Sequence, residues 1–177
     1  MTLSVRFWGT RGSVPAPGAS TVRYGGNTPC LEVRTPAGGL LIFDAGTGIR
    51  ELGRELMQKA NGSPITADVF LSHAHWDHIQ GLPYFQPLFV RGNRFTFWST
   101  ASLMPAVDRA LHEQMSPSVF PVPLDEVGAH LEFRALGDKT ELTLIHGPFA
   151  DMPSCNAHHE GWSGSFDKLE TYLWRPA

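Results

Sequence analysis

The chain has 177 residues, a formal net charge of −3, 42% hydrophobic residues and 18% charged residues, which is typical of a globular protein of one domain. The slight acidity argues against general binding to nucleic acid, which usually needs a basic surface. No apolar run reaches the roughly 20 residues of a membrane span, and the first residues lack the pattern of a secretory signal. The sequence therefore predicts a cytoplasmic protein without a membrane partner.

In chain order we expect a strand at 3–9, a loop at 10–20, a hairpin of strands at 30–35 and 40–46, a helix at 47–60, strands at 65–72 and 94–100, a helix at 102–115, a proline-rich loop at 116–128, and strands at 130–136 and 141–147. The first helix carries Ile49, Leu52 and Leu56 on one face. The second has Ser102 as a candidate N-cap and Pro105 in its first turn. Because hairpins and helices both occur, we expect a sheet-rich α/β domain rather than a purely parallel sheet.

Two compositional features bear on the chemistry. Cys30 and Cys155 lie far apart and form no CxxC pair, so neither a disulfide framework nor a thiolate zinc site is indicated. The chain has eleven arginines and three lysines. Arginine suits bidentate contact with phosphate, which hints at anionic substrates, although the codon bias of a GC-rich genome would give the same imbalance.

The stretch SHAHWDHIQG places four ligand-type side chains within six positions, as His73, His75, Asp77 and His78. It follows an apolar strand that we expect at the centre of the sheet. His73 and His75 are two residues apart and can point to one side of an extended segment. Asp77 and His78 can point toward a second metal position nearby. Neutral imidazole and carboxylate bind zinc, manganese or iron. The spacing favours two cations sharing one loop, with a surface histidine cluster as the alternative.

This segment resembles the H-x-H-x-D-H signature of the metallo-β-lactamase superfamily. FWGTRGSVP, LIFDAGTGIREL and LSHAHWDHIQGLPYF are also similar to the branch that contains ribonuclease Z and the cyclic-phosphate phosphodiesterases. The similarity extends over about residues 3–146 of a single domain, 1–177. It implies an α/β fold of the αββα sandwich type with a dinuclear site, in which two zinc ions are expected and Mn²⁺ or Fe²⁺ are alternatives.

The resemblance also implies roles for individual residues. His73 and His75 would bind the first metal, and Asp77 and His78 the second. Asp77 would in addition contact the nucleophile, which makes it the catalytic residue. Asp44 would orient a metal ligand through a hydrogen bond, and its alternative role is to start a turn.

Five further positions are expected to contribute. The GTRGS stretch would line the substrate edge with the backbone N–H groups of Thr10, Arg11 and Ser13, or serve as a plain turn. His146 stands where the family has its next metal ligand. Asp167, some twenty residues later, is the candidate bridging carboxylate, with a helix start as its alternative role.

The tail, residues 147–177, departs from the family pattern, because no histidine follows Asp167 and no alternating apolar run precedes it. A truncated chain, a shifted reading frame and a divergent ending would each explain this. The sandwich would then be incomplete in its C-terminal half. We expect the tail to lack the strand that carries a bridging aspartate, and the second metal to bind weakly.

The expected function is that of a metal-dependent hydrolase, a phosphodiesterase that attacks a small cyclic or nucleotide-derived phosphate ester with a metal-activated water. The sequence gives no strong nucleic-acid signal, and a homo-oligomer is compatible with it. Two alternatives stay open. One is thioester hydrolysis or mono-iron oxygenase chemistry on the same fold, and the other is an incomplete domain that binds metal without turnover.

Overall fold

The computed structural model describes residues 2–137 and, in the tail, residues 151–153, 155–157, 159–160 and 163–164. The expected strand at 141–147 lies outside these residues. The chain divides into two compact units, Met1–Lys139 and Thr140–Ala177. In the second unit the described residues are helical apart from a bend at Asp151.

The first unit holds all the named helices and strands. Its strands are β1 Ser4–Gly9, β2 Cys30–Arg34, β3 Leu40–Phe43, β4 Thr66–Phe70, β5 Arg94–Thr100 and β6 His130–Leu136. Its helices are α1 Gly48–Ala60, α2 Trp76–Ile79 and α3 Met104–Gln114, with 3-10 turns η1 Ala19–Thr21, η2 Leu82–Tyr84, η3 Gln86–Phe89 and η4 Leu124–Glu126. No helix among the described residues is long and apolar enough to cross a membrane.

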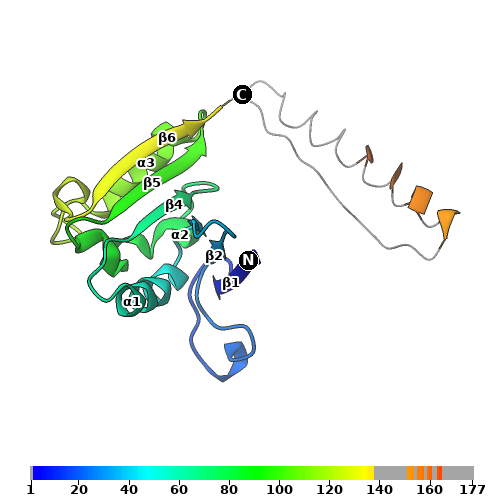
Figure 1. Cartoon of the computed structure of the whole chain (residues 1–177), viewed down its shortest axis with the longest axis horizontal. Helices are drawn as coiled ribbons and strands as arrows, with labels where there is room; N and C mark the ends of the chain where they lie inside the picture. The colour runs from blue at the N-terminus through cyan, green and yellow to red at the C-terminus, as the bar shows by residue number, and fades with distance from the viewer. Residues whose placement is uncertain (1, 138–150, 154, 158, 161–162, 165–177) are drawn as a thin grey trace. The chain divides into compact units, whose positions relative to one another are not determined.

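The six strands form one mixed sheet whose spatial order is the chain order, β1 to β6 (Figure 1). The pairs β1–β2 and β2–β3 are antiparallel, and the pairs from β3 to β6 are parallel. A mixed sheet with helices is therefore confirmed. Parallel neighbours need a crossover, and α1 supplies it between β3 and β4, while α3 supplies it between β5 and β6.

Helix α1 shows why this sequence folds as it does. Ile49, Leu52 and Leu56 are buried, which follows from their helical spacing. The helix ends at Asn61, which adopts a left-handed conformation with φ of 44°, and Gly62 follows with φ of 87°. Asparagine and glycine tolerate this conformation best, so the sequence itself stops the helix here.

One face of the sheet is covered by helices. Ile42, Val69 and Phe97 are register partners on three adjacent strands, and all three are fully buried. They share a single hydrophobic core with Leu52 of α1 and Leu111 of α3. Both helices therefore pack on the same side of the sheet.

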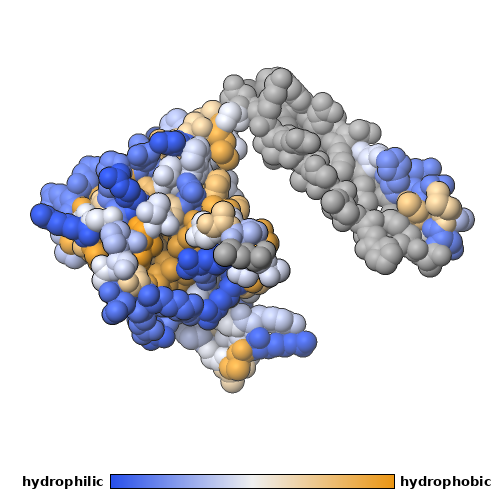
Figure 2. Space-filling view, in the orientation of Figure 1, coloured by the Kyte–Doolittle hydropathy of each residue, from blue (hydrophilic) through white to orange (hydrophobic). Residues whose placement is uncertain are grey.

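The opposite face, which we call the open face, carries apolar side chains on a second row of register partners. These are Phe7, Leu31, Phe43, Phe70 and Trp98. The rings of Phe43 and Phe70 stack with centroids 5.0 Å apart, and those of Phe70 and Trp98 with centroids 6.2 Å apart. Phe7 is 63% exposed and Phe43 is 37% exposed. Figure 2 shows apolar residues gathered on one side of this unit with hydrophilic residues around them.

One expected detail of α3 is wrong. The helix begins at Met104 with Leu103 as its N-cap residue, so Ser102 does not cap it. The Ser102 hydroxyl lies instead 3.2 Å from the hydroxyl of Thr100 at the end of β5. Pro105 does occupy the first turn, as expected.

Candidate metal centre

The strand β4 delivers the histidine-rich segment to the carboxyl end of the sheet. Leu71 prolongs the pairing with β5 by donating its N–H to the Trp98 carbonyl at 2.8 Å. The chain then leaves the sheet between its two parallel neighbours, and α2 begins with His75 as its N-cap residue. Because β4 is central, as expected, these side chains emerge in the middle of one sheet edge.

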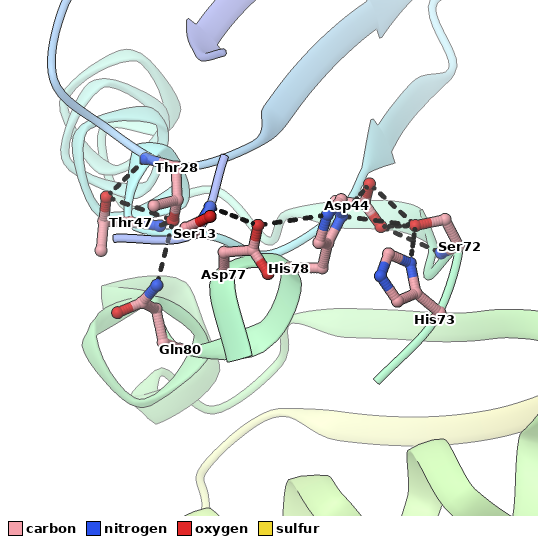
Figure 3. A network of polar contacts seen from close by, with 9 residues as sticks. All are labelled: Ser13, Thr28, Asp44, Thr47, Ser72, His73, Asp77, His78 and Gln80. Atoms are coloured by element: carbon pink, nitrogen blue, oxygen red, sulfur yellow. Dashed lines mark hydrogen bonds and ion pairs between the residues drawn. The ribbon is translucent and has the colours of Figure 1, made fainter. Parts of the chain in front are cut away.

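The structure brings the four predicted ligands together. The ring centroid of His73 lies 4.3 Å from that of His75 and 4.1 Å from that of His78. The Nε2 atom of His78 lies 3.6 Å from Oδ2 of Asp77. The close-up in Figure 3 shows His78 between Asp77 and His73. Their role as metal ligands stays a prediction.

Asp44 makes the contacts that a ligand-orienting residue requires (Figure 3). It directly follows β3 and has φ of 61°. Its carboxylate accepts hydrogen bonds from the N–H and the hydroxyl of Ser72, at 2.9 and 2.8 Å. Its Oδ2 also lies 2.8 Å from Nδ1 of His78. A proton on Nδ1 leaves Nε2 of His78 with its lone pair free, which is the form that binds a metal.

Asp77 is held by the loop that follows β1. The backbone N–H of Ser13 donates to Oδ2 of Asp77 at 2.8 Å. This hydrogen bond lowers the pKa of Asp77 below its ordinary value, so the carboxylate is charged at neutral pH. Burial, followed by the neighbouring rings of His78 and His75, lowers the pKa of His73. Neutral imidazole beside charged carboxylate is the protonation pattern that a metal site needs.

The GTRGS loop, which was expected at a substrate edge or as a plain turn, uses backbone N–H groups for contacts within the protein. The N–H groups of Thr10 and Arg11 both donate to the carbonyl of Asn27, at 3.1 and 3.0 Å. The N–H of Ser13 is used by Asp77. These three N–H groups therefore stabilise the loop and its contact with α2, rather than facing a substrate.

Close packing of two loops fixes the position of α2. Ala45 donates its N–H to the His78 carbonyl at 2.7 Å, and Gly81 donates to the Ala45 carbonyl at 2.9 Å. A Cβ atom on Gly46 would lie 2.4 Å from the Asp77 carbonyl oxygen, and one on Gly81 would lie 2.1 Å from the Gly46 oxygen. Only glycine permits this approach, so both glycines position Asp77 and His78.

A second part of the same network anchors the loop before α1. Thr28 and Thr47 exchange hydrogen bonds between backbone N–H and hydroxyl, at 2.9 and 2.7 Å. Gln80, at the end of α2, donates to the Thr28 hydroxyl at 3.4 Å (Figure 3). Sequence reasoning missed these residues and also Ser72, whose hydroxyl lies 3.0 Å from Nδ1 of His73. The only signal for Ser72 was its position directly before the first histidine.

The donor types present fit a divalent metal such as zinc, because imidazole and carboxylate are its usual ligands. Within the described part of the chain, however, no three such donors already form a metal-binding arrangement. His146 and Asp167, the later ligands expected from the resemblance, lie outside the described residues. The described residues therefore supply the donor chemistry of a site whose full ligand set is not among them.

Comparison with known proteins identifies the family. A family model described as the beta-lactamase superfamily domain matches residues 40–165. The chain belongs to the metallo-β-lactamase superfamily. The fold of this superfamily implies binding of divalent metal ions in general, and the helices and mixed sheet of residues 2–137 are part of that fold.

Several curated relatives of this superfamily member are ribonucleases Z. That of Halobacterium salinarum is 40% identical over 83 residues, which cover 47% of this chain and 23% of the relative. That of Thermococcus kodakarensis is 31% identical over 129 residues, covering 63% of this chain and 37% of the relative. That of Haloarcula marismortui is 30% identical over 132 residues, which cover 73% of this chain and 39% of the relative. These relatives place the chain in the ribonuclease Z-like branch of the superfamily.

A solved structure from Thermotoga maritima, provisionally described as a metallo-β-lactamase, matches with a TM-score of 0.40 and 21% identity over 80% of this chain and 62% of that one.

The chain spans 23% to 39% of the length of the three ribonuclease Z relatives. The name of these relatives points to RNA. The comparisons therefore give no support to the expectation of a small phosphate ester without nucleic-acid binding.

Proposed function

We propose that this superfamily member is a metal-dependent phosphodiesterase that hydrolyses phosphodiester bonds of RNA. The observation that carries the proposal is the convergence of three imidazole rings and the Asp77 carboxylate in one loop, with ring centroids 4.1 and 4.3 Å apart. Similarity to proteins named ribonuclease Z supports RNA as the substrate class. The small phosphate esters expected from the sequence then serve as test substrates.

In this proposal His73, His75, Asp77 and His78 would hold divalent metal, with His146 and Asp167 as further candidates. The bound metal would supply polarisation of the phosphoryl group and acidification of water. Zinc is the first choice, since it prefers nitrogen ligands, and Mn²⁺ or Fe²⁺ are alternatives.

The protein side chains have defined tasks. Asp77 is charged because Ser13 hydrogen-bonds it, so it can accept a hydrogen bond from the attacking water and direct that water at phosphorus. Asp44 and Ser72 keep His78 and His73 oriented. The water oxygen forms the new bond to phosphorus, the bond from phosphorus to the leaving nucleoside oxygen breaks, and a proton of the water reaches that oxygen through solvent.

The test measures hydrolysis of bis(p-nitrophenyl) phosphate and of a labelled single-stranded RNA by the chain loaded with Zn²⁺ or Mn²⁺. We expect both substrates to be cleaved and a chelator to stop both reactions. Replacement of Asp77 by Ala should lower the rate by at least about 100-fold, because a ligand and a water contact are lost together. Asp125→Ala, at an 83% exposed side chain in η4, is the matched control and should keep the rate.

Four outcomes would count against the proposal. Activity that survives both the chelator and Asp77→Ala contradicts a metallohydrolase. Cleavage of the ester but not of RNA restores the small phosphate ester as the substrate class. Metal binding without turnover supports an incomplete metal-binding domain, and one iron per chain in protein purified without added metal supports an oxygenase.

A further inference from the structure

A cavity of about 530 Å³ is lined by residues of α2, η2 and α3. Ala74 and Trp76 line it, and they alternate along the chain with His73, His75 and Asp77. The cavity therefore begins one residue away from the candidate ligands. We call it the aromatic groove, and its walls include Trp76, Gln80, Tyr84, Gln114, Val119 and Phe120.

The walls of the aromatic groove present flat aromatic surface to solvent. Trp76 is 63% exposed and Tyr84 is 60% exposed. Tyr84 meets Phe120 edge to face with ring centroids 5.9 Å apart, which holds its ring in place. Large aromatic side chains left this exposed suit stacking against a planar ring.

One buried amide, that of Gln114, lies in the wall of the groove. Gln114 is 8% exposed, and its Nε2 donates to the carbonyl of Ile79 at 3.2 Å. Its Oε1 is buried and has no hydrogen-bond partner. An unsatisfied buried acceptor is costly, so this oxygen favours a ligand that brings an N–H donor into the groove.

Charge narrows the choice of ligand. Among the described residues that line the groove, the charged one is Glu113, whose carboxylate repels phosphate. A volume of about 530 Å³ is within the range of small-molecule sites. The ligand that matches these features is a neutral aromatic ring with an amino group rather than an anion.

A larger cavity, of about 740 Å³, lies at the other end of the sheet. Its cationic walls are already paired, because Arg6 and Lys59 both contact Glu55, and Arg34 contacts Glu32. Those ion pairs account for the charges there without a ligand. The unpaired Gln114 oxygen distinguishes the aromatic groove from it.

We propose that the aromatic groove binds an unpaired nucleobase that carries an amino group, next to the phosphate that is cleaved. The base stacks on Trp76 or Tyr84, and a rotation of the Gln114 side chain brings its buried Oε1 to the groove surface, where the amino N–H of the base donates to it. The role as a substrate subsite rests on the proposed RNA phosphodiesterase function, whereas binding of the base itself does not.

The experiment measures equilibrium binding of two nucleosides to the full chain by calorimetry. Adenosine and purine riboside stack alike, but purine riboside lacks the amino group. We expect adenosine to bind about 3- to 10-fold more tightly, the effect of one net hydrogen bond.

Gln114→Met should remove this difference. Trp76→Ala and Tyr84→Ala should weaken both nucleosides by about 10-fold. Tyr24→Ala, at a 73% exposed tyrosine outside the groove, should change neither.

The outcomes separate the two proposals. Failure of the folded chain to bind adenosine, or adenosine binding that is unchanged in Trp76→Ala and Tyr84→Ala, overturns the groove. A preference for adenosine that persists in Gln114→Met overturns the role of Gln114. Tyr84 is exposed, so its variant remains informative even if Gln114→Met is unstable. Adenosine binding that depends on Gln114, in a chain that cleaves no phosphodiester, would keep the groove and reject the hydrolase.

Discussion

Asp44 adopts a backbone conformation that is unfavourable for most residues. Its φ of 61° costs on the order of 1 kcal/mol for a residue other than glycine. Hydrogen bonds from Ser72 and the contact with Nδ1 of His78 offset this cost. The strain is therefore placed where the carboxylate can control the tautomer and direction of a candidate metal ligand.

Replacement of Asp44 by Asn should separate orientation from folding. Asparagine tolerates the same backbone conformation but has one carbonyl oxygen in place of the carboxylate. We expect zinc affinity to fall by about 10- to 100-fold, while the melting temperature changes little. Competition with a chromophoric chelator and a thermal melt measure the two quantities. Unchanged zinc affinity would show that Asp44 does not act through His78.

For single residues, the sequence predicts which residue types form the candidate site better than it predicts their hydrogen-bond partners. His73, His75, Asp77 and His78 could be found because they lie within six positions. The hydrogen bond between Ser13 and Asp77 joins residues 64 positions apart, and no local pattern contains it. The GTRGS stretch was expected at a substrate edge or in a plain turn, and the sequence could not reveal that Thr10 and Arg11 donate to Asn27, because that partner is set by the folded loop.

Helix α1 contains a glycine, Gly53, at a position where neighbouring side chains leave no room for a larger residue. Gly53 lies in its interior, where glycine normally weakens a helix by up to about 1 kcal/mol relative to alanine. An added Cβ would, however, lie 2.7 Å from Cδ2 of Phe85 and 3.0 Å from Cδ of Pro87. Phe85 is fully buried, so its ring has little room to move.

Gly53→Ala should therefore destabilise the protein, against the usual direction for a helix interior. We expect a loss of about 1–3 kcal/mol in the free energy of unfolding, typical of overpacking. Denaturant unfolding monitored by circular dichroism measures it. Gly137→Ala is the control, because a Cβ there meets no atom within 4 Å. A stabilised Gly53→Ala variant would show that the helix can shift away from Phe85.

Element boundaries follow from periodicity where the pattern is long. The strands β5 and β6 have the bounds expected from the sequence, and burial alternates along the seven residues of β5. The cap of α3 could not be predicted in this way. A serine before a helix is a common cap, but here Thr100 competes for its hydroxyl and the helix starts later.

In the whole molecule, residues 2–137 leave one face of the sheet with apolar side chains exposed. Val5 is 49% exposed and Phe7 is 63% exposed at the edge strand β1. The resemblance to the superfamily implies a second sheet against such a face. Contiguous apolar surface of this kind favours association when nothing covers it.

We expect the 177-residue chain to associate as its concentration rises, with the open face as the contact. Sedimentation velocity over a range of concentrations measures this. Phe7→Ser should weaken association, because it removes an exposed ring from the face. Val22→Ser, at a 78% exposed valine in a loop, should not. A chain that stays monomeric at all concentrations would show that this face is covered in solution.

The order of the strands has a consequence for how the protein is made. Each strand from β2 onward lies beside the strand that precedes it in the chain. On the ribosome, the N-terminal part of a chain emerges first and can begin to fold. Every new strand therefore finds its neighbour already outside the exit tunnel. His73, His75, Asp77 and His78 follow β4, so they can gather before β5 and β6 have left the tunnel.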